Sequence, residues 1–344
     1  MDISELDYPL PPEAIAQTPA EPREAARLLR IDRGSGALGD HRFGELPALL
    51  RPGDCVVVND SRVIPARVFA DDQSGRRIEL LFVEALAPER WRALVRPGRR
   101  CHPGVELRAG GEGGARLRVV AVEPDGVRVI ERLDGTIDAL LRAQGVPPLP
   151  PYIARHAKPG PEDVARYQTV YAEPPGSVAA PTAGLHFSDA VLAAMRARGI
   201  DVHRLTLHVG PGTFRPIKGH RVDDHIVAAE RAILPAETAR AVNAALADGR
   251  RVVAVGTTAT RTLESAVDAG GVVQPLDGHA TLTIHPGHRF RVVGALVTNF
   301  HLPRSSLLSL VCAFAGRELV LRAYAHAVAA GYRFYSYGDA TLIE

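Results

Sequence analysis

The sequence lacks the features of disulfide-rich, zinc-binding and membrane-spanning proteins. It contains three cysteines among 344 residues, and no two of them form a Cys-x-x-Cys pair. An odd number of widely spaced cysteines argues against a disulfide framework or a structural zinc site and fits a reducing cytosol. No stretch approaches the roughly 18 apolar residues that a membrane-spanning helix requires.

An export signal is also missing from the first residues. Residues 1–6 are acidic and contain no apolar run, unlike a secretory signal peptide. We therefore expect a cytoplasmic protein with no membrane partner. The formal net charge of +2 neither requires nor excludes a nucleic-acid partner, because a local basic patch can bind phosphates on a nearly neutral protein.

Length and composition indicate a globular protein of two domains. Hydrophobic residues make up 46% and charged residues 23% of the chain, an ordinary balance. A chain of 344 residues exceeds the size of one simple core. Between residues 63 and 146, short β-rich segments separated by glycine and proline predict an all-β, barrel-like domain.

The rest of the chain, residues 1–62 and 147–344, predicts a layered α/β domain. Helical patterns alternate with β-rich runs, which is typical of an α/β sheet. The expected helices are 188–195, 235–248, 257–266 and 318–329, and the expected strands are 202–209, 252–255, 292–297 and 332–337. The predicted fold class is therefore α/β, with a larger layered domain and an inserted smaller barrel-like domain.

A segment rich in small residues at 179–187 contains the first candidate site residues. Thr182, Gly184 and His186 lie just before a predicted helix. Small residues let a ligand approach the backbone, and a histidine at a helix start is placed for acid–base work. A tight turn with a packed histidine is the alternative, and the residues alone favour it.

The segment 206–214 has the same character. His208 lies near the end of a predicted strand, and Gly210, Gly212 and Thr213 follow it. In α/β sheets, ligands gather beyond the carboxyl ends of strands. A purely structural turn explains this segment equally well.

A strand, a glycine turn and a helix start rich in hydroxyl groups follow at 255–264. The exposed N–H groups of such a turn can hold a carboxylate or a phosphate. The pattern is neither a P-loop nor Gly-x-Gly-x-x-Gly, and a simple capping role is the alternative. The candidate binding residues are Thr257, Thr258, Arg261 and Glu264.

Two polar segments near the end of the chain provide further candidates. Asn299 and His301 are hydrogen-bonding groups in an apolar setting, and Phe300 between them is suited to a cation or a base. Tyr337 and Asp339 follow, where a carboxylate beside aromatic rings can pair with a ribose hydroxyl, an amine or a sulfonium. Locally satisfied loops are the alternative for both segments.

The other histidines and the basic residues are weaker candidates. His285 and His288 are separated by a Pro-Gly turn and no carboxylate completes a set of ligands, so we expect no metal site. A basic stretch in the β-rich domain is suited to RNA phosphates, or equally to a solvated surface. It contains Arg90, Arg92, Arg96, Arg99, Arg100, His102 and Arg108.

Taken together and in order, these motifs resemble one family. The chain is similar to the S-adenosylmethionine:tRNA ribosyltransferase-isomerases of queuosine biosynthesis over nearly its whole length. Besides the five motifs above, the resemblance rests on the segments 23–29, 53–54, 59–67, 148–153 and 167–171.

The resemblance implies a fold, a reaction and two substrates. The fold is a larger α/β domain with a smaller β-barrel-like insertion. The ribosyl part of S-adenosylmethionine is transferred to the 7-aminomethyl-7-deazaguanine (preQ1) base of tRNA and rearranges to give epoxyqueuosine, while adenine and methionine leave. S-adenosylmethionine is a substrate here, and no cofactor or metal is expected.

This chemistry requires an acid, a base and holders for charged groups. The sulfonium acidifies the C5′ hydrogens of the ribose, so a base must reach them, and adenine leaves more easily when protonated. His186, His208, His301 and Asp339 are the catalytic candidates. Asn59, Asp60 and Arg62 are candidates for contacts with the ribose or with the target base.

The chain departs from the family pattern at two positions. In His-x-Met-His-x-Glu, Ala228 replaces the second histidine, and Thr341 replaces the methionine of Gly-Asp-x-Met-Leu-Ile. These changes keep two alternatives open. One is a divergent relative that uses S-adenosylmethionine with a small-molecule acceptor or with none, and the other is a binding protein without turnover.

Overall fold

The computed structural model describes residues 1–123, 126–154, 159–210, 217 and 219–344, and divides them into two compact units. The larger unit contains residues 1–61, 168–174 and 180–344. The smaller unit contains residues 62–167 and 175–179. The mixed α/β fold with an inserted barrel, expected from the sequence, is confirmed.

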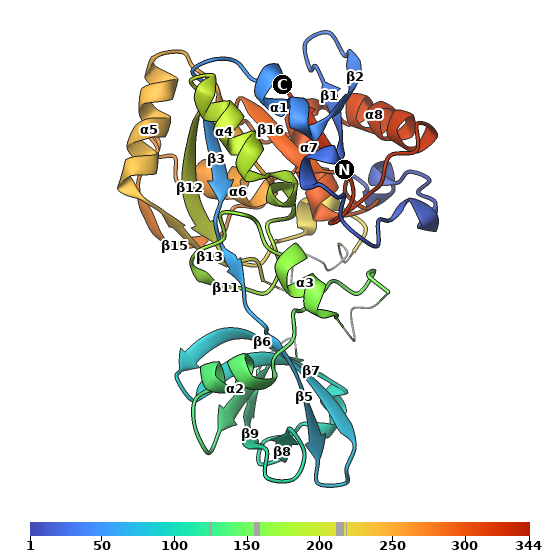
Figure 1. Cartoon of the computed structure of the whole chain (residues 1–344), viewed down its shortest axis with the longest axis vertical. Helices are drawn as coiled ribbons and strands as arrows, with labels where there is room; N and C mark the ends of the chain where they lie inside the picture. Colours follow the sequence, from blue (N-terminus) through green and yellow to red (C-terminus); the bar gives the residue numbers. More distant parts are fainter. Residues whose placement is uncertain (124–125, 155–158, 211–216, 218) are drawn as a thin grey trace. The chain divides into compact units, whose positions relative to one another are not determined.

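Nine strands form one mixed sheet in the described part of the larger unit (Figure 1). Their order is β15 (Leu276–Ala280), β13 (Glu230–Leu234), β12 (Asp201–Leu207), β3 (Cys55–Asn59), β14 (Val252–Val255), β16 (Ala295–Asn299), β17 (Ala340–Ile343), β1 (Arg27–Ile31) and β2 (Leu38–Arg42). The neighbouring strands β12, β3, β14 and β16 are parallel, whereas β17 is antiparallel to β16. The carboxyl ends of four central strands therefore meet at one edge of the sheet.

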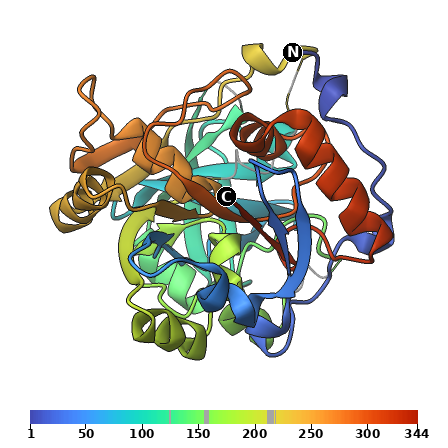
Figure 2. The same ribbon diagram turned by 90° about the horizontal axis from the view of Figure 1, so that it is seen from above.

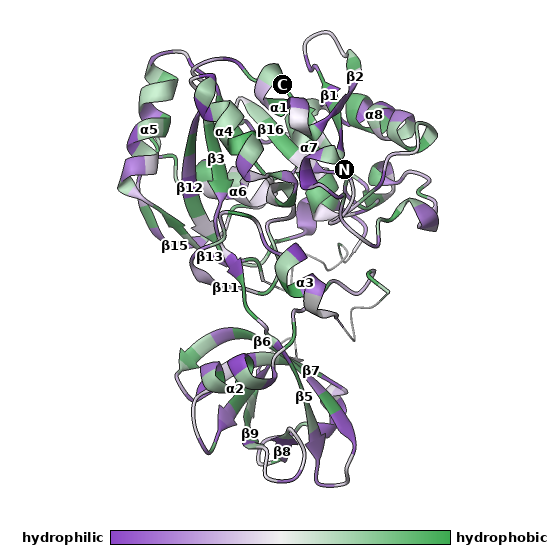
Figure 3. Cartoon of the chain, viewed as in Figure 1, coloured by the Kyte–Doolittle hydropathy of each residue, from purple (hydrophilic) through white to green (hydrophobic). Residues whose placement is uncertain are grey.

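Strands β3 and β14 form because their residues are nearly all apolar and mostly β-branched. Every residue of β3 and β14 is buried, and Figure 3 shows hydrophobic colours along β3. Strands of a parallel sheet are buried on both faces, and their sequences read as continuous apolar runs.

Helices cover both faces of this sheet. Val56 and Val58 of β3 and Val253 of β14 pack in one core with Leu192 and Met195 of α4. Figure 2 shows the blue and yellow-green helices on one side of the sheet and the orange and red helices on the other. The helices of this unit are α1 (Leu46–Leu49), α4 (Asp189–Ala197), α5 (Ala236–Ala247), α6 (Thr257–Ser265), α7 (Ser306–Ala315) and α8 (Arg317–Ala329), with short 3-10 turns at Ile3–Leu6, Pro12–Ala14, Arg23–Ala25, Phe43–Glu45, Thr182–His186 and Val222–Asp224.

The predicted strand at 332–337 is wrong. The last strand is β17, and the aromatic residues before it fill the core instead of pairing in the sheet. Phe300 stacks with Phe334 at a centroid distance of 4.8 Å and with Tyr332 at 5.5 Å. Tyr335 has a φ of 74°, which no regular strand contains.

The smaller unit is a closed, antiparallel barrel. Its strands in order are β10 (Arg128–Arg132), β7 (Arg90–Arg96), β6 (Arg77–Ala87), β5 (Arg67–Asp72), β8 (Glu106–Ala109) and β9 (Ala115–Val122), and β9 pairs with β10. Helix α2 (Ile137–Gln144) packs its apolar face into the barrel core. Around the barrel lie a 3-10 turn at Gly98–Arg100, helix α3 (Pro161–Arg166) and the paired strands β4 (Arg62–Val63) and β11 (Pro175–Ser177).

Residues 147–167 belong with the barrel, although the sequence places them in the larger domain. The Arg67 guanidinium of β5 donates a hydrogen bond of 3.2 Å to the carbonyl oxygen of Leu149. Leu149 and Ile153 are also fully buried. These contacts tie the proline-rich segment to the barrel strand.

All three cysteines are free and buried. Burial raises the pKa of the Cys55 thiol to about 11 and that of Cys312 to about 12, and it also raises the pKa of Cys101. Thiols that stay protonated are poor nucleophiles. None of the helices in the described residues is long and apolar enough to cross a membrane.

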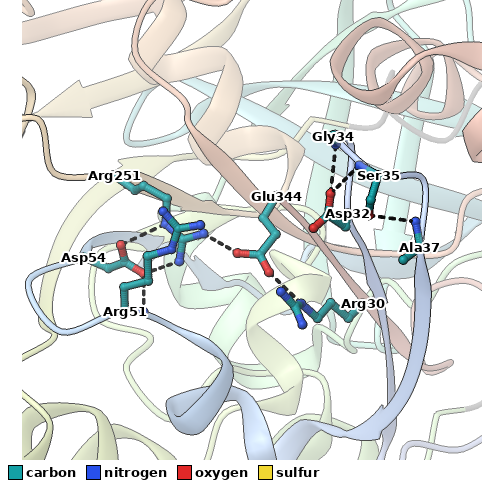
Figure 4. Close-up of polar contacts among 9 residues, drawn as sticks. All are labelled: Arg30, Asp32, Gly34, Ser35, Ala37, Arg51, Asp54, Arg251 and Glu344. Atoms are coloured by element: carbon teal, nitrogen blue, oxygen red, sulfur yellow. Dashed lines mark hydrogen bonds and ion pairs between the residues drawn. The ribbon is translucent and has the colours of Figure 1, made fainter.

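A network of ion pairs holds the sheet edge opposite the carboxyl ends of the four parallel strands (Figure 4). The Arg251 guanidinium, just before β14, contacts Asp54 at 2.6 Å and also binds the Glu344 carboxylate. Glu344, just after β17, accepts a hydrogen bond of 2.6 Å from Arg30 of β1. Burial acts to raise the pKa of Glu344, but the two arginines outweigh it and lower the pKa.

This network makes the stability of the protein depend on pH. We expect Glu344→Gln to lower the free energy of unfolding by about 1–3 kcal/mol at pH 7, because both arginines lose a charged partner. A carboxylate whose pKa is lower in the folded state than in the unfolded state stabilises the folded protein at pH values above the unfolded pKa. This stabilisation is lost as the pH falls through the folded pKa. Urea unfolding at pH 7 and pH 3 should show the difference from wild type shrinking at pH 3. Glu112→Gln, at an exposed position with no ion pair among the described residues, is the matched control, and equal losses in both variants would contradict the prediction.

Candidate functional site

Polar side chains gather where the four parallel strands end. Asn59 ends β3, His208 follows β12, Gly256 and Thr257 follow β14, and Asn299 ends β16. These positions come from four motifs that are far apart in the sequence. The sheet topology brings them to one edge, where α/β proteins bind ligands.

The Asn59 carboxamide connects these strand ends. Its oxygen accepts hydrogen bonds from the amides of Ser61 and Leu207, each at 3.0 Å. Its nitrogen donates to the Leu207 carbonyl at 2.9 Å and to the Thr258 hydroxyl at 3.1 Å. Asn59, a candidate for substrate contact, therefore fixes the positions of β3, β12 and the start of α6.

A small pocket, open to solvent, lies at this edge. Its polar lining includes Thr182, Thr257, Thr258, Asn299, His301 and Ser336. Five of these six were predicted as site residues. Ala180, Ala183 and Gly256 also line it, so small residues allow a ligand to approach the backbone.

Asn299 is the central polar group of the pocket. Its oxygen accepts a hydrogen bond of 2.9 Å from the Thr182 hydroxyl. Its nitrogen donates to the Tyr335 carbonyl at 3.1 Å and lies 3.2 Å from Nε2 of His186. His186 does not line the pocket, and it reaches the site through Asn299.

Both buried histidines are neutral at pH 7. Burial, with the nearby positive charges of Arg333 and Arg23, lowers the pKa of His186 to about 3. Burial alone lowers the pKa of His301 to about 3. Nε2 of His301 lies 3.0 Å from the Thr298 hydroxyl, whereas its Nδ1 has no hydrogen-bond partner among the described residues. His301 therefore presents a free ring nitrogen at the pocket.

His208 and Asp60 form a second polar group on β12 and β3. Nδ1 of His208 lies 2.7 Å from the Ser61 hydroxyl, and burial with the charge of Arg231 lowers the pKa of His208. Asp60 accepts a hydrogen bond of 2.7 Å from Thr206. Burial outweighs that hydrogen bond and raises the pKa of Asp60.

A second, smaller pocket shares Thr257, Thr258 and Leu307 with the first. Arg261 and Glu230 form a buried ion pair in its wall, and only 5% of each side chain is exposed. The Arg261 Nε donates to the carbonyl of Leu282 at 3.0 Å, and Oε1 of Glu230 accepts from the amide of Gly210 at 2.9 Å. Arg261 is thus neutralised inside the protein and is no free cation for an anionic ligand.

Three predicted site residues are occupied by contacts inside the protein. Oε1 of Glu264 accepts from the amides of Val292 and Val293, each at 3.0 Å. The Asp339 carboxylate accepts from the amides of Arg27 and Arg333 at 2.9 and 2.8 Å. The Phe300 ring is fully buried in the aromatic core, so it has no face for a cation or a base. These three side chains support the backbone around the pocket.

None of the remaining candidates among the described residues lines the first pocket. A Cβ on Gly184 would lie 2.3 Å from the Tyr171 hydroxyl, so this glycine makes room for a side chain of the protein itself. Tyr337 is buried and does not line the pocket. Arg62 lies in β4 of the smaller unit. Gly212 and Thr213 lie outside the described residues.

Sequence reasoning missed several pocket residues. Thr298, Leu307, Tyr335 and Ser336 line the pocket. Tyr335 has a φ of 74°, a conformation that is costly for a residue with a side chain and recurs at functional sites. No sequence pattern marks such a conformation, whereas Thr298 and Ser336 belong to motifs in which only their neighbours were chosen.

Three of the seven basic residues in the barrel stretch are neutralised by carboxylates. Arg90 contacts Glu131 at 2.6 Å, Arg92 contacts both Glu84 and Glu123 at 2.9 Å, and Arg100 contacts Asp72 at 3.5 Å. Arg96, Arg99, His102 and Arg108 are exposed and have no ion pair among the described residues. The described residues also contain no group of three or more side chains suited to a metal ion.

The fold and the pocket define an α/β protein with a polar pocket at the carboxyl ends of its parallel strands. A family model described as queuosine biosynthesis protein matches residues 3–343. The chain therefore belongs to the queuosine biosynthesis protein family.

Relatives match over their full length. Proteins named S-adenosylmethionine:tRNA ribosyltransferase-isomerase from Thermus thermophilus and Moorella thermoacetica are 52% and 50% identical to this chain. The matches cover 99% of both chains in the first case and 100% in the second. A crystal structure of S-adenosylmethionine tRNA ribosyltransferase from Thermotoga maritima has a TM-score of 0.56 and 35% identity, covering 99% of this chain and 100% of that one.

The low pKa values of the buried histidines can be measured directly. We expect NMR titration to find His186 and His301 neutral at pH 5, since both pKa values lie near 3. In the urea-unfolded protein, the same residues should titrate near the ordinary value of about 6.5. Because the unfolded chain then binds more protons, stability falls as pH decreases from about 6.5 toward 3. Titration of either residue above pH 6 in the folded protein would contradict this assignment.

Proposed function

We propose that this protein transfers and isomerises the ribosyl group of S-adenosylmethionine onto the preQ1 base of tRNA. The products are epoxyqueuosine in tRNA, adenine and methionine. The observation that carries the proposal is the polar pocket at the ends of four parallel strands in a chain of this family. S-adenosylmethionine acts as a substrate in this proposal, and the reaction uses no cofactor or metal.

His301 is the proposed base. It lines the pocket, its Nδ1 is unpartnered among the described residues, and its ring is neutral at pH 7, so it retains a lone pair. Removal of a C5′ proton from the sulfonium-activated ribose requires such an acceptor within hydrogen-bond reach. His208, which is less buried, is the second candidate for proton transfer. His186 acts as a positioning residue, because it reaches the pocket through Asn299.

The departures from the family pattern leave the described pockets intact. Ala228 has an exposed side chain and contributes its carbonyl oxygen, which accepts from Arg261 at 3.3 Å. Thr341 is buried in β17 and donates to the Thr298 carbonyl at 3.0 Å. Neither residue lines the two pockets among the described residues. This placement favours the tRNA reaction over the small-molecule alternative.

We propose tRNA as the macromolecular partner and the cytoplasm as the compartment. The names of the relatives include tRNA, and the wobble base of a tRNA is available in the cytoplasm. The exposed Arg96, Arg99 and Arg108 are candidates for phosphate contacts. Contacts of this kind weaken as salt concentration rises.

Adenine release tests the proposed reaction. The full chain is incubated with S-adenosylmethionine, with and without tRNA carrying preQ1, and both the nucleobase and the tRNA mass are measured. We expect adenine release that requires this tRNA, together with the matching mass gain. Release without RNA would instead identify a small-molecule reaction, and binding without release would identify a protein that has lost turnover.

The role of His301 can be tested in the same assay. We expect His301→Gln to lower kcat by about 10²–10⁴-fold, the usual contribution of a positioned acid or base. KM for S-adenosylmethionine should change much less, because glutamine keeps a polar side chain of similar length. His279→Gln, at an exposed position in β15, is the matched control. Retention of kcat in a folded His301→Gln variant would exclude the proposed base.

A further inference from the structure

Two helices begin at the same pair of pockets. Thr257 and Thr258, the first residues of α6, line both pockets, and so does Leu307, the second residue of α7. Ser306, the first residue of α7, also lines the second pocket. The positive ends of two helix dipoles therefore meet at one place, which favours an anion.

The amide groups at these helix starts are available to a ligand. Gly256, the residue before α6, makes no side-chain cap, and the amides of Thr257, Thr258 and Ala259 have no hydrogen-bond partner among the described residues. The Ser305 hydroxyl, just before α7, accepts a hydrogen bond from the amide of Leu308. The amides of Ser306 and Leu307 have no hydrogen-bond partner among the described residues.

The Thr257 side chain is an independent indication of a ligand. Only 7% of Thr257 is exposed, so the residue is more than nine-tenths buried. Its hydroxyl has no hydrogen-bond partner among the described residues, although it lines both pockets. The residue is buried but its hydroxyl oxygen is not sealed from solvent, so the hydroxyl faces the pockets and can bond a ligand group placed between the two helices.

The second pocket also matches the methylene groups of an amino acid. Ile284, Leu307 and Leu310 supply an apolar wall for methylene groups. Glu230 lines the same pocket, but its carboxylate is already paired with Arg261 and accepts from the amide of Gly210. The pocket therefore combines donors for an α-carboxylate with an apolar surface for the methylene groups beside it.

We propose that the second pocket binds the amino-acid end of S-adenosylmethionine, with its α-carboxylate held between the starts of α6 and α7 by the Thr257 hydroxyl and the free amides. This inference rests on the proposed function for the identity of the ligand. The nucleoside end then lies in the first pocket beside His301, because the two pockets share Thr257, Thr258 and Leu307.

The test measures binding of two unreactive probes to the full chain. S-adenosylhomocysteine and its decarboxylated analogue lack the sulfonium and differ in the α-carboxylate alone. Isothermal titration is carried out with and without an anticodon stem-loop RNA that carries preQ1. We expect wild type to bind the carboxylate-bearing probe at least about tenfold more tightly, which is typical of hydrogen bonds to a charged group.

Two substitutions address the donors separately. Thr257→Val removes the hydroxyl and keeps the shape of the side chain. Ser306→Pro removes one backbone N–H at the first position of a helix, where proline is accommodated. The preceding residue, Ser305, already has the extended backbone that a following proline requires, with ψ of 153°. Ser306→Ala is the control for Ser306→Pro, because both variants lack the serine hydroxyl but only the alanine variant retains the backbone N–H.

The outcomes separate this inference from the proposed reaction. Weaker binding of S-adenosylhomocysteine in Thr257→Val, and in Ser306→Pro relative to Ser306→Ala, with unchanged binding of the decarboxylated probe, supports the inference. It is overturned if wild type binds the two probes equally, or if the folded variants weaken both probes alike. Neither result depends on turnover, so failure of the ribosyl transfer assay would overturn the proposed function alone.

Discussion

The Asn59 carboxamide is the interaction on which the geometry of the site depends. Three of its four hydrogen bonds join β3 to β12 and to the start of α6, and the fourth holds the amide of Ser61. Because it lies at the end of a wholly buried strand, all four bonds are formed away from water, where an unpaired polar group is costly. An error in the register of these strands would break several of them together, so the carboxamide fixes the end of β12 relative to Thr258 at the pocket.

The site owes its polarity to neutral groups rather than to free charges. Arg261 and Glu230 neutralise each other, and the carboxylates of Glu264 and Asp339 are held by backbone amides. The pocket itself presents hydroxyls, a carboxamide and a neutral histidine. Such a lining suits a substrate that brings its own positive charge, since a fixed cation would repel a sulfonium and a free anion would stabilise the ground state.

Patterns in the sequence predict the fold class and the approximate positions of β12, β14 and β16, because both depend on local apolar runs and turn residues. β3, β14 and α6 are examples in which a buried run meets a polar turn. The patterns cannot predict that Asp339 and Glu264 face backbone amides instead of the pocket, since both segments look equally polar in the sequence. Helix α7 was missed because its almost uniformly apolar sequence has no amphipathic period.

The burial of all three cysteines has a practical consequence for spectroscopy. Cys55, Cys101 and Cys312 are shielded and remain protonated at neutral pH, so maleimide reagents have little access to a thiolate. A cysteine introduced at a surface position of each unit would then be the preferred target for a dye. Donor and acceptor fluorophores can thus be attached without first replacing the native cysteines, and the distance between the barrel and the larger unit can be followed while RNA binds.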